Sequence, residues 1–268
     1  MKSPIVISCV NQKGGVSKTT TTVNLGAGLA QRGYKVLLID LDSQCNLTQS
    51  LVGDLHAQQR CVANCLLEET GFQGVIAQTK VPNLFLVPAG EDMTGIDLNL
   101  VGVLSREAVL KRSLGKSNLS AFDFVLIDTA PYISLLTVNA LVASTHYIVP
   151  TTAEYLPLRG IERLTQNVQN VKDTLNPSLS LLGVVLTQYD SRKAITGQVE
   201  TTLKEELGDS LFNTRIRINT KFSSSPIDQQ TIFEYEQNEG KGSEDYASLT
   251  LEVLTRLGLV LEKGVANG

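Results

Sequence analysis

The sequence has few of the residues from which metal centres and disulfide frameworks are built. Its 268 residues include only two histidines and four cysteines, Cys9, Cys45, Cys61 and Cys65. The cysteine spacings match neither a zinc site nor a disulfide framework. Cys61 and Cys65 could share one face of a helix, but two thiols without further ligands are typical of buried packing. The sequence therefore predicts no cysteine-based metal site and no stabilisation by disulfides.

Long apolar runs and an excess of positive charge are also missing. No apolar stretch is long enough to span a bilayer, and residues 1–4 lead straight into an apolar run without the pattern of a signal peptide. The formal net charge is −4 at pH 7, which excludes a global attraction to nucleic acid or to an anionic membrane. We therefore expect a cytoplasmic protein in which any such binding comes from a local patch.

Nothing in the sequence has the composition of a linker between two cores. There is no internal repeat and no low-complexity segment, and 42% of the residues are hydrophobic, which is enough for a large core. The sequence therefore predicts a single domain over residues 1–268.

Short apolar runs alternate with helical patterns along the chain. The predicted strands are Ile5–Val10, Lys35–Asp40, Leu84–Pro88, Phe122–Asp128, His146–Pro150 and Leu181–Thr187. The predicted helices are Lys18–Arg32, a segment around Thr94–Leu114, Leu135–Ala143, Leu158–Leu175 and Ile195–Leu207. Several strands are apolar on both faces, as in parallel strands covered by helices. The alternation predicts an α/β fold with a doubly wound, mostly parallel sheet, whose ligands bind at the carboxyl ends of the strands.

The most informative segment follows the first predicted strand. Residues 13–20 read Lys-Gly-Gly-Val-Ser-Lys-Thr-Thr. A strand, a glycine-containing loop and a helix in succession point several backbone N–H groups at one spot, where the positive end of the helix dipole also lies. Lys18 would reach the β and γ phosphates of a triphosphate, and the Thr19 hydroxyl would ligate Mg²⁺. Ser17 replaces the usual glycine, and Lys13 is an additional cation without a use in ordinary triphosphate binding.

Four further segments complete an ordered set of motifs. Residues 36–44 end in Asp-Leu-Asp-Ser-Gln, and residues 122–131 end in Ile-Asp-Thr-Ala-Pro. With residues 186–192 and 216–226, these segments resemble the motifs of the ParA/MinD family of deviant Walker A ATPases, in particular its ParA branch. The resemblance covers about residues 5–257, although Ser43 and Ala130 replace prolines that are usual in the family. It implies a P-loop nucleotide-binding fold and ATP with Mg²⁺ as cofactors.

The resemblance also implies roles for individual residues. Hydrolysis needs cations and a carboxylate on opposite sides of the γ phosphate. Asp42 would hold the attacking water, Asp40 would anchor the Mg²⁺ shell or the loop lysine, and Asp128 would hold Mg²⁺ through water. An aspartate at a strand end can instead cap a helix or form a turn. The implied nucleotide contacts are Gly14, Gly15, Val16, Ser17, Lys18, Thr19, Thr20, Gln188 and Asn219.

The resemblance also implies that ATP controls dimerisation, through Lys13, and that residues in the last third of the chain bind DNA. In the family, the lysine at the position of Lys13 crosses to the phosphates of a partner subunit, so that ATP holds a homodimer together; within one subunit it could simply pair with a carboxylate. The ParA dimer binds DNA without sequence preference, and the matching residues here are Arg192 and Lys221. Lys193, Arg215 and Arg217 lie nearby in sequence, but so do acidic residues, and a solvated mixed-charge surface is the alternative.

The resemblance finally implies a slow ATPase stimulated by a ParB-like or cargo adaptor protein. Such a protein is nucleoid-associated and segregates a plasmid or chromosome, or positions a protein body such as a carboxysome. The chain also resembles the shorter ParA proteins, which lack an N-terminal DNA-reading domain. The nearest alternative is a MinD-like membrane switch, but Ser243–Lys263 has too few basic residues for an anchor and resembles a packed closing helix. A nitrogenase-type iron–sulfur subunit needs differently placed cysteines, and a dethiobiotin-synthetase-type ligase would lack the late motifs.

Overall fold

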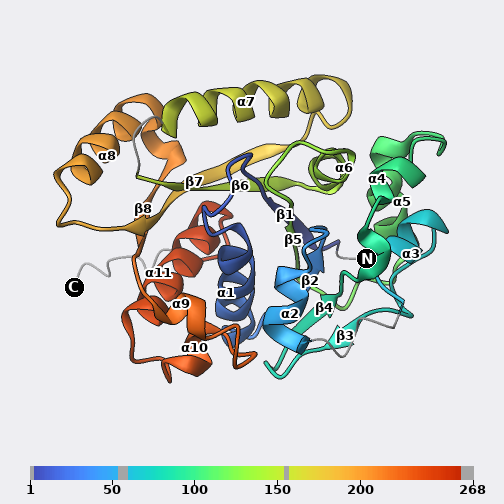
Figure 1. The fold of residues 1–268 in the computed structure, drawn as a ribbon, viewed down its shortest axis with the longest axis horizontal. Coiled ribbons are helices and arrows are strands. Elements are labelled where there is room, and N and C mark those ends of the chain that lie inside the picture. Colours follow the sequence, from blue (N-terminus) through green and yellow to red (C-terminus); the bar gives the residue numbers. More distant parts are fainter. Residues whose placement is uncertain (1–2, 54–59, 154–156, 261–268) are drawn as a thin grey trace, which may run out of the picture.

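A computed structural model describes residues 3–53, 60–153 and 157–260 (Figure 1). It contains an eight-stranded sheet in the order β3-β4-β2-β5-β1-β6-β7-β8, in which every neighbouring pair is parallel except β3 and β4. The strands are β1 Ile5–Cys9, β2 Val36–Asp40, β3 Ala77–Gln78, β4 Leu84–Val87, β5 Phe124–Asp128, β6 His146–Thr152, β7 Ser180–Tyr189 and β8 Leu211–Arg217.

Helices cover both faces of this sheet (Figure 1). They are α1 Lys18–Gln31, α2 Asn46–Val52, α3 Val62–Leu67, α4 Ile96–Asn99, α5 Val109–Lys116, α6 Leu135–Ala143, α7 Pro157–Thr174, α8 Ala194–Leu207, α9 Lys221–Ser224, α10 Ile232–Tyr235 and α11 Lys241–Arg256. One apolar core lies between the sheet and α1, α10 and α11, and the opposite face is covered by α6, α7 and α8. The predicted doubly wound fold is confirmed.

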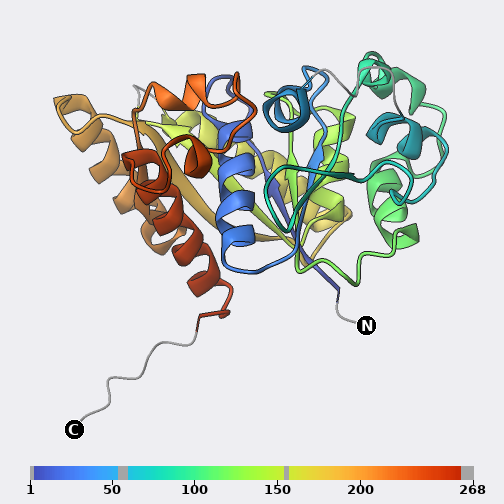
Figure 2. The same ribbon diagram turned by 90° about the horizontal axis from the view of Figure 1, so that it is seen from below.

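The central strands are apolar because helices cover them on both sides. Every residue of β2 and β5 is buried. The pairing register sets Cys9 and Asp40 beside Asp128, so β1, β2 and β5 end at the same level. The motifs that follow these three strands are therefore brought together at one edge of the sheet, as Figure 2 shows for the loops above the strands.

Close packing at two glycines holds α1 against its neighbours. A Cβ atom at Gly26 would lie 2.7 Å from Leu38 Cδ2 of β2, and one at Gly28 would lie 2.3 Å from Thr250 Oγ1 of α11. No larger residue fits at either position without displacing the partner. The helix that follows the glycine loop is thus pinned between the sheet and the closing helix.

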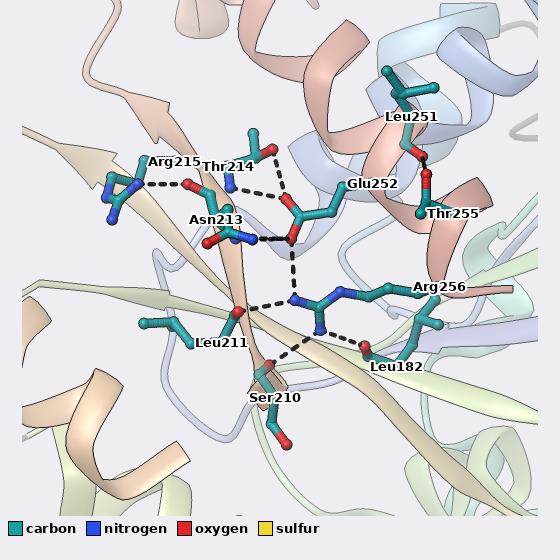
Figure 3. Close-up of polar contacts among 10 residues, drawn as sticks. All are labelled: Leu182, Ser210, Leu211, Asn213, Thr214, Arg215, Leu251, Glu252, Thr255 and Arg256. Atoms are coloured by element: carbon teal, nitrogen blue, oxygen red, sulfur yellow. Dashed lines mark hydrogen bonds and ion pairs between the residues drawn. The ribbon is translucent and has the colours of Figure 1, made fainter. Parts of the chain in front are cut away.

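Polar contacts join the end of α11 to the edge strand β8 (Figure 3). Arg256 donates to the carbonyl oxygens of Leu182 and Leu211 at 2.9 and 2.8 Å, and its guanidinium lies 3.9 Å from the Phe212 ring centre. The Glu252 carboxylate accepts from the backbone N–H groups of residues 213 and 214 at 2.8 and 2.9 Å, where β8 is irregular. These contacts satisfy backbone groups that an edge strand would otherwise leave open.

Two sequence predictions about helices are wrong in their extent. The segment Thr94–Leu114 is not one helix but contains α4 and the start of α5, because the chain leaves the α-helical conformation after Asn99 and Ser105 (φ 48°) takes a left-handed backbone conformation between the two helices. The closing helix is Lys241–Arg256 and not Ser243–Lys263, whose last residues lie outside the described part of the chain. Its apolar side is buried as expected, with Leu249 and Val253 fully enclosed.

Among residues 3–53, 60–153 and 157–260, no helix has both the length and the apolar character that a membrane crossing requires.

Candidate nucleotide-binding site

The loop between β1 and α1 is held from behind through its carbonyl groups. Gln188, at the end of β7, donates to the Gly15 carbonyl at 2.5 Å, and Thr187 donates to the Val16 carbonyl at 3.2 Å. Asn11, which begins the loop, donates to the Pro150 carbonyl of β6 at 2.7 Å. Because two loop carbonyl oxygens and the Asn11 side chain are engaged by neighbouring strands, the loop is held in shape before any ligand binds.

The N–H groups of the same loop have no such partners. Within the described residues, no protein acceptor meets the backbone N–H groups of residues 14–20. Lys13, Gly14 and Gly15 are exposed at its mouth. A row of open N–H groups at the start of a 14-residue helix is an anion-binding arrangement.

The loop turns into α1 through left-handed backbone at Ser17. This residue has φ 65° and ψ 33°, and its side chain makes no cap hydrogen bond to the helix. Glycine adopts such angles without a steric penalty, which explains why glycine is usual at this position of a phosphate loop. Ser17 therefore stores a small strain in this chain.

Lys18 lies inside the cradle that the loop forms. Its side chain donates to the Lys13 carbonyl at 3.3 Å, and the residue is 7% exposed. Burial lowers the pKa of Lys18, although Cys9 and Asp128 act in the opposite direction. An anion in the cradle would restore the stabilisation that the ammonium group loses by leaving water.

Thr19 and Asp128 lie side by side below the loop. The Thr19 hydroxyl donates to Asp128 Oδ2 at 2.6 Å. Burial, reinforced by the neighbouring Asp40 carboxylate, raises the pKa of Asp128 to about 8. A hydroxyl and a buried carboxyl next to a second carboxyl are hard oxygen donors in need of positive charge, and this donor set fits Mg²⁺.

Both carboxylate oxygens of Asp40 accept hydrogen bonds from nearby residues. Its Oδ1 accepts from the Asp42 N–H at 3.1 Å, and its Oδ2 accepts from the N–H and the hydroxyl of Thr48 at 2.9 and 2.7 Å. Burial raises its pKa to about 6, and these hydrogen bonds oppose the rise. Asp40 thus orients the Asp42 turn and joins it to α2; a role as a magnesium anchor stays a prediction.

Asp42 follows β2 and faces the same edge of the sheet. It is 6% exposed, and its Oδ1 accepts from the Gln44 N–H at 3.0 Å. In the described part of the chain its other oxygen, Oδ2, accepts no hydrogen bond. The side chain is therefore held by one oxygen and retains the other for a water molecule or a ligand.

A pocket of about 430 Å³ opens beside the loop. It is lined by Gly15, Ser17, Thr20 and Gln188 from the loop side and by Asn219, Phe222 and Tyr246 from the late motifs and α11. Figure 2 shows the dark blue loop before α1 next to the orange segment that contains α9. The fold thus brings the two late residues, Gln188 and Asn219, together with the phosphate loop, as a nucleotide base pocket requires.

A larger pocket of about 650 Å³ lies at the opposite end of the sheet, around Arg256 and Glu252 (Figure 3). Two of its half-buried charged groups already bind each other and the backbone, with Arg256 donating to Glu252 at 3.1 Å. Because these groups offer few open hydrogen-bonding positions, the pocket has the character of a packing seam and the smaller pocket is the better candidate site.

The predicted DNA contacts follow the carboxyl ends of β7 and β8 and form ion pairs within the chain. Arg192 pairs with Asp190 at 2.8 Å, and Lys221 lies 3.5 Å from Glu236. Arg217 pairs with Asp245, and Arg215 pairs with Glu200. Arg217 lines the pocket beside the loop, whereas Arg215 lines the larger pocket at the opposite end of the sheet, and each of these four cations is paired with a carboxylate. Their role in DNA binding stays a prediction.

Sequence reasoning missed three residues that organise the site. Thr48 holds Asp40, Thr187 holds the loop, and Glu236 contacts Asn219. Thr187 stood in a quoted motif but without a role. Thr48 and Glu236 carry no signal of their own, since they act through partners that the fold brings to them.

Comparisons with known proteins agree with this geometry. The family described as AAA domain matches residues 5–181. The sporulation initiation inhibitor protein Soj of Bacillus subtilis is 38% identical over 250 residues, which is 92% of this chain and 97% of that protein. The crystal structure of cobyrinic acid a,c-diamide synthase from Mycobacterium smegmatis with bound ADP and magnesium is 31% identical, with a TM-score of 0.82 and 96% coverage of both chains.

A fourth comparison concerns the fold alone. The ATP complex of a variant of McdA from Cyanothece has a TM-score of 0.83 at 20% identity, covering 98% of this chain and 99% of that one. The glycine loop, the aligned strand ends and these likenesses lead to the same assignment. The chain therefore belongs to the ParA/MinD family of P-loop ATPases.

Proposed function

We propose that this protein is an ATP-dependent partitioning ATPase. In the proposed cycle, ATP with Mg²⁺ closes a homodimer, the dimer binds DNA without sequence preference, and hydrolysis releases it. The observation that supports this proposal best is the open row of N–H groups in residues 14–20, with Lys18 inside it and the Asp42 carboxylate close enough to act on the charge of Lys18. The 37% identity to the chromosome-partitioning ATPase Soj of Treponema pallidum favours partitioning over the other activities of the fold.

The chain supplies the parts that phosphoryl transfer needs. The loop N–H groups and Lys18 would bind the β and γ phosphates and stabilise the charge that develops on them. Mg²⁺, held by Thr19 and through water by Asp128, would supply further neutralisation. Asp42 would hold the attacking water with its open oxygen, while Asp40 keeps the Asp42 turn in place.

Lys13 would provide the dependence of the dimer on ATP. It is exposed at the mouth of the loop, while Lys18 is buried behind it. Lys13 of one subunit would then contact the phosphates held by the other, so only the triphosphate completes the interface. The lifetime of the dimer is set by a slow hydrolysis, which a ParB-like or cargo adaptor would stimulate.

In the dimer, Arg192 and Lys221 would contact DNA phosphates, which places the protein on the nucleoid. The cargo would be a plasmid, a chromosome or a protein body. The alternative activity is an amide-forming ligase, because a diamide synthase is 31% identical to this chain. A ligase would consume ATP only with an acid and an amine donor and would have no use for DNA.

The proposal is tested by dimerisation and DNA retention in the Asp42→Ala background. With ATP and Mg²⁺, light scattering is expected to show a dimer that binds unrelated duplexes with similar affinity, weakening steeply as salt rises. ADP is expected to leave monomers. Lys13→Ala is expected to weaken the dimer, whereas the control Lys111→Ala, an exposed lysine near the amino end of β1, is expected to behave like the parent.

Equal mass in ATP and ADP would refute the sandwich dimer. A dimer that does not bind DNA but is retained on anionic liposomes would instead support the MinD-like membrane switch.

A further inference from the structure

Glu236 is a buried carboxylate behind the predicted base pocket. It follows α10, and its side chain is 1% exposed. Its Oε1 accepts from Asn219 Nδ2 at 2.9 Å and lies 3.5 Å from the Lys221 ammonium group. Its Oε2 accepts from the N–H and the hydroxyl of Ser243, at 2.8 and 3.0 Å. One carboxylate therefore contacts a predicted nucleotide residue and a predicted DNA residue through the same oxygen.

The start of α11 encloses this carboxylate. A Cβ atom at Gly240 would lie 2.0 Å from Glu236 Cδ, and one at Gly242 would lie 3.1 Å from Asn219 Nδ2. Neither position has room for a side chain. Glu236 thus has little freedom to turn away from Asn219, and its charge must be compensated by the donors already around it.

Asn219 and Lys221 are also joined directly. Asn219 Oδ1 accepts from the Lys221 N–H at 3.0 Å, while the Asn219 residue lines the pocket beside the phosphate loop. The Asn219 amide keeps one N–H and one lone pair for a ligand. The Lys221 side chain is half exposed, and its ammonium group lies within ion-pair distance of Glu236, whose negative charge opposes its attraction to other anions.

We propose that Glu236 is a positioning residue with two effects: it orients the Asn219 amide for the nucleotide base, and it restrains the Lys221 ammonium group from DNA. This inference rests on the proposed function, since it takes the base pocket and the DNA contact from there. It adds that one buried carboxylate, that of Glu236, connects the base pocket with the DNA contact.

The two effects predict opposite results for one substitution. Glu236→Gln keeps the shape of the side chain but removes its charge. Asn219 then loses a charged acceptor and is held less firmly, which weakens base binding. Lys221 loses its counter-charge and becomes more available to phosphates, which strengthens DNA binding. A merely structural role would weaken both.

The experiment compares ligands that do and do not contain the base. For Glu236→Gln we expect ATP to bind about fivefold more weakly. Inorganic tripolyphosphate with Mg²⁺ is expected to bind as in the parent, because the phosphate loop is untouched. In the Asp42→Ala background with saturating ATP, DNA binding is expected to be about threefold tighter, with a salt slope steeper by up to about one unit.

Ser243→Ala is the matched control. It removes a hydrogen bond to the same carboxylate but touches neither Asn219 nor Lys221, so ATP and DNA binding are expected to stay as in the parent. Glu236→Asp serves if Glu236→Gln does not fold. The shorter side chain keeps the negative charge but places it one methylene group farther from Asn219 and Lys221. We therefore expect weaker ATP binding and tighter DNA binding, both by smaller factors than in Glu236→Gln. Equal losses of ATP and tripolyphosphate, or weaker DNA binding, in whichever Glu236 variant folds would overturn the proposal.

Two further variants separate this inference from the function on which it rests. Asn219→Ala is expected to weaken ATP binding, and Lys221→Ala is expected to weaken DNA binding. If Asn219→Ala leaves ATP binding unchanged, the assignment of the base pocket is wrong. If Lys221→Ala leaves DNA binding unchanged, the assignment of the DNA contact is wrong. If both act as expected while Glu236→Gln changes neither ligand, only the role of Glu236 is wrong.

Discussion

Replacing Asp42 by alanine is the sharpest test of the proposed hydrolysis. Asp42 follows the end of β2. Its Oδ1 accepts from the Gln44 N–H at 3.0 Å, and its backbone N–H donates to Asp40 Oδ1 at 3.1 Å. These two contacts fix its direction. Alanine keeps the backbone contact to Asp40 but removes the oxygen that would hold the attacking water.

The expected loss follows from what that oxygen contributes. A positioned base or water-holding group typically contributes about 10²- to 10⁴-fold to a rate. Lys18 and the loop N–H groups remain in the variant, so stabilisation of the phosphate charge is retained. We therefore expect hydrolysis at least about tenfold slower, which corresponds to a barrier higher by about 1.4 kcal/mol or more. ATP binding is expected to persist, because none of the groups proposed to hold the phosphates is changed.

The assay is a single turnover of ATP on excess protein, with nucleotide affinity measured separately. Asp42→Asn is the matched variant, since it can still accept from Gln44 but cannot take a proton from water. It is expected to be slow as well. Hydrolysis at the parent rate in Asp42→Ala, with unchanged ATP affinity, would show that another group holds the water.

Three further expectations concern binding and stability. Lys18→Ala is expected to lose ATP binding outright, as measured by equilibrium titration, because its ammonium group is the cation inside the cradle; retained affinity would contradict this role. Ser17→Gly is expected to raise the melting temperature of the ligand-free protein by about 2 °C, since the relief of left-handed strain slightly exceeds the entropy cost of glycine; a lower melting temperature would show that Ser17 is unstrained. Glu252→Gln is expected to lower the free energy of unfolding by about 2 kcal/mol at pH 7. Burial acts to raise the pKa of Glu252, but hydrogen bonds from the β8 backbone and from Arg256 outweigh it and lower the pKa. The contribution of Glu252 is therefore present above its ordinary pKa and is lost as pH falls through the lowered one, so in urea unfolding the two proteins are expected to converge in acid; an equal difference at pH 7 and at pH 3 would contradict this.

Much of the fold could be predicted from local patterns. The six predicted strands are present, because buried parallel strands such as β2 and β5 need apolar residues on both faces. The alternation of strands with helices leads to their parallel order, which brings Asp40, Asp42 and Asp128 to one edge. The phosphate loop is equally local, since its glycines and the start of α1 are contiguous in sequence.

The missed elements lack such a local pattern. Strand β8 reads Leu-Phe-Asn-Thr-Arg-Ile-Arg, and its polar residues are stable at the sheet edge because Glu252 and Arg256 of α11 satisfy its backbone. The helix predicted over 94–114 is interrupted between α4 and α5, where Ser105 takes a left-handed backbone conformation. A periodic apolar pattern does not report such backbone angles.

The electrostatic state of the candidate surfaces depends on contacts between distant segments. The sequence shows Lys221 and Arg217 as a cluster of cations, and folding gives them Glu236 and Asp245 as partners. Spacing along a helix or strand predicts which side chains share a face, but not which charges from other elements will meet them. Interaction between charges depends on distance and on the exclusion of water, and both quantities are set only when α10 and α11 pack against α1 and β8.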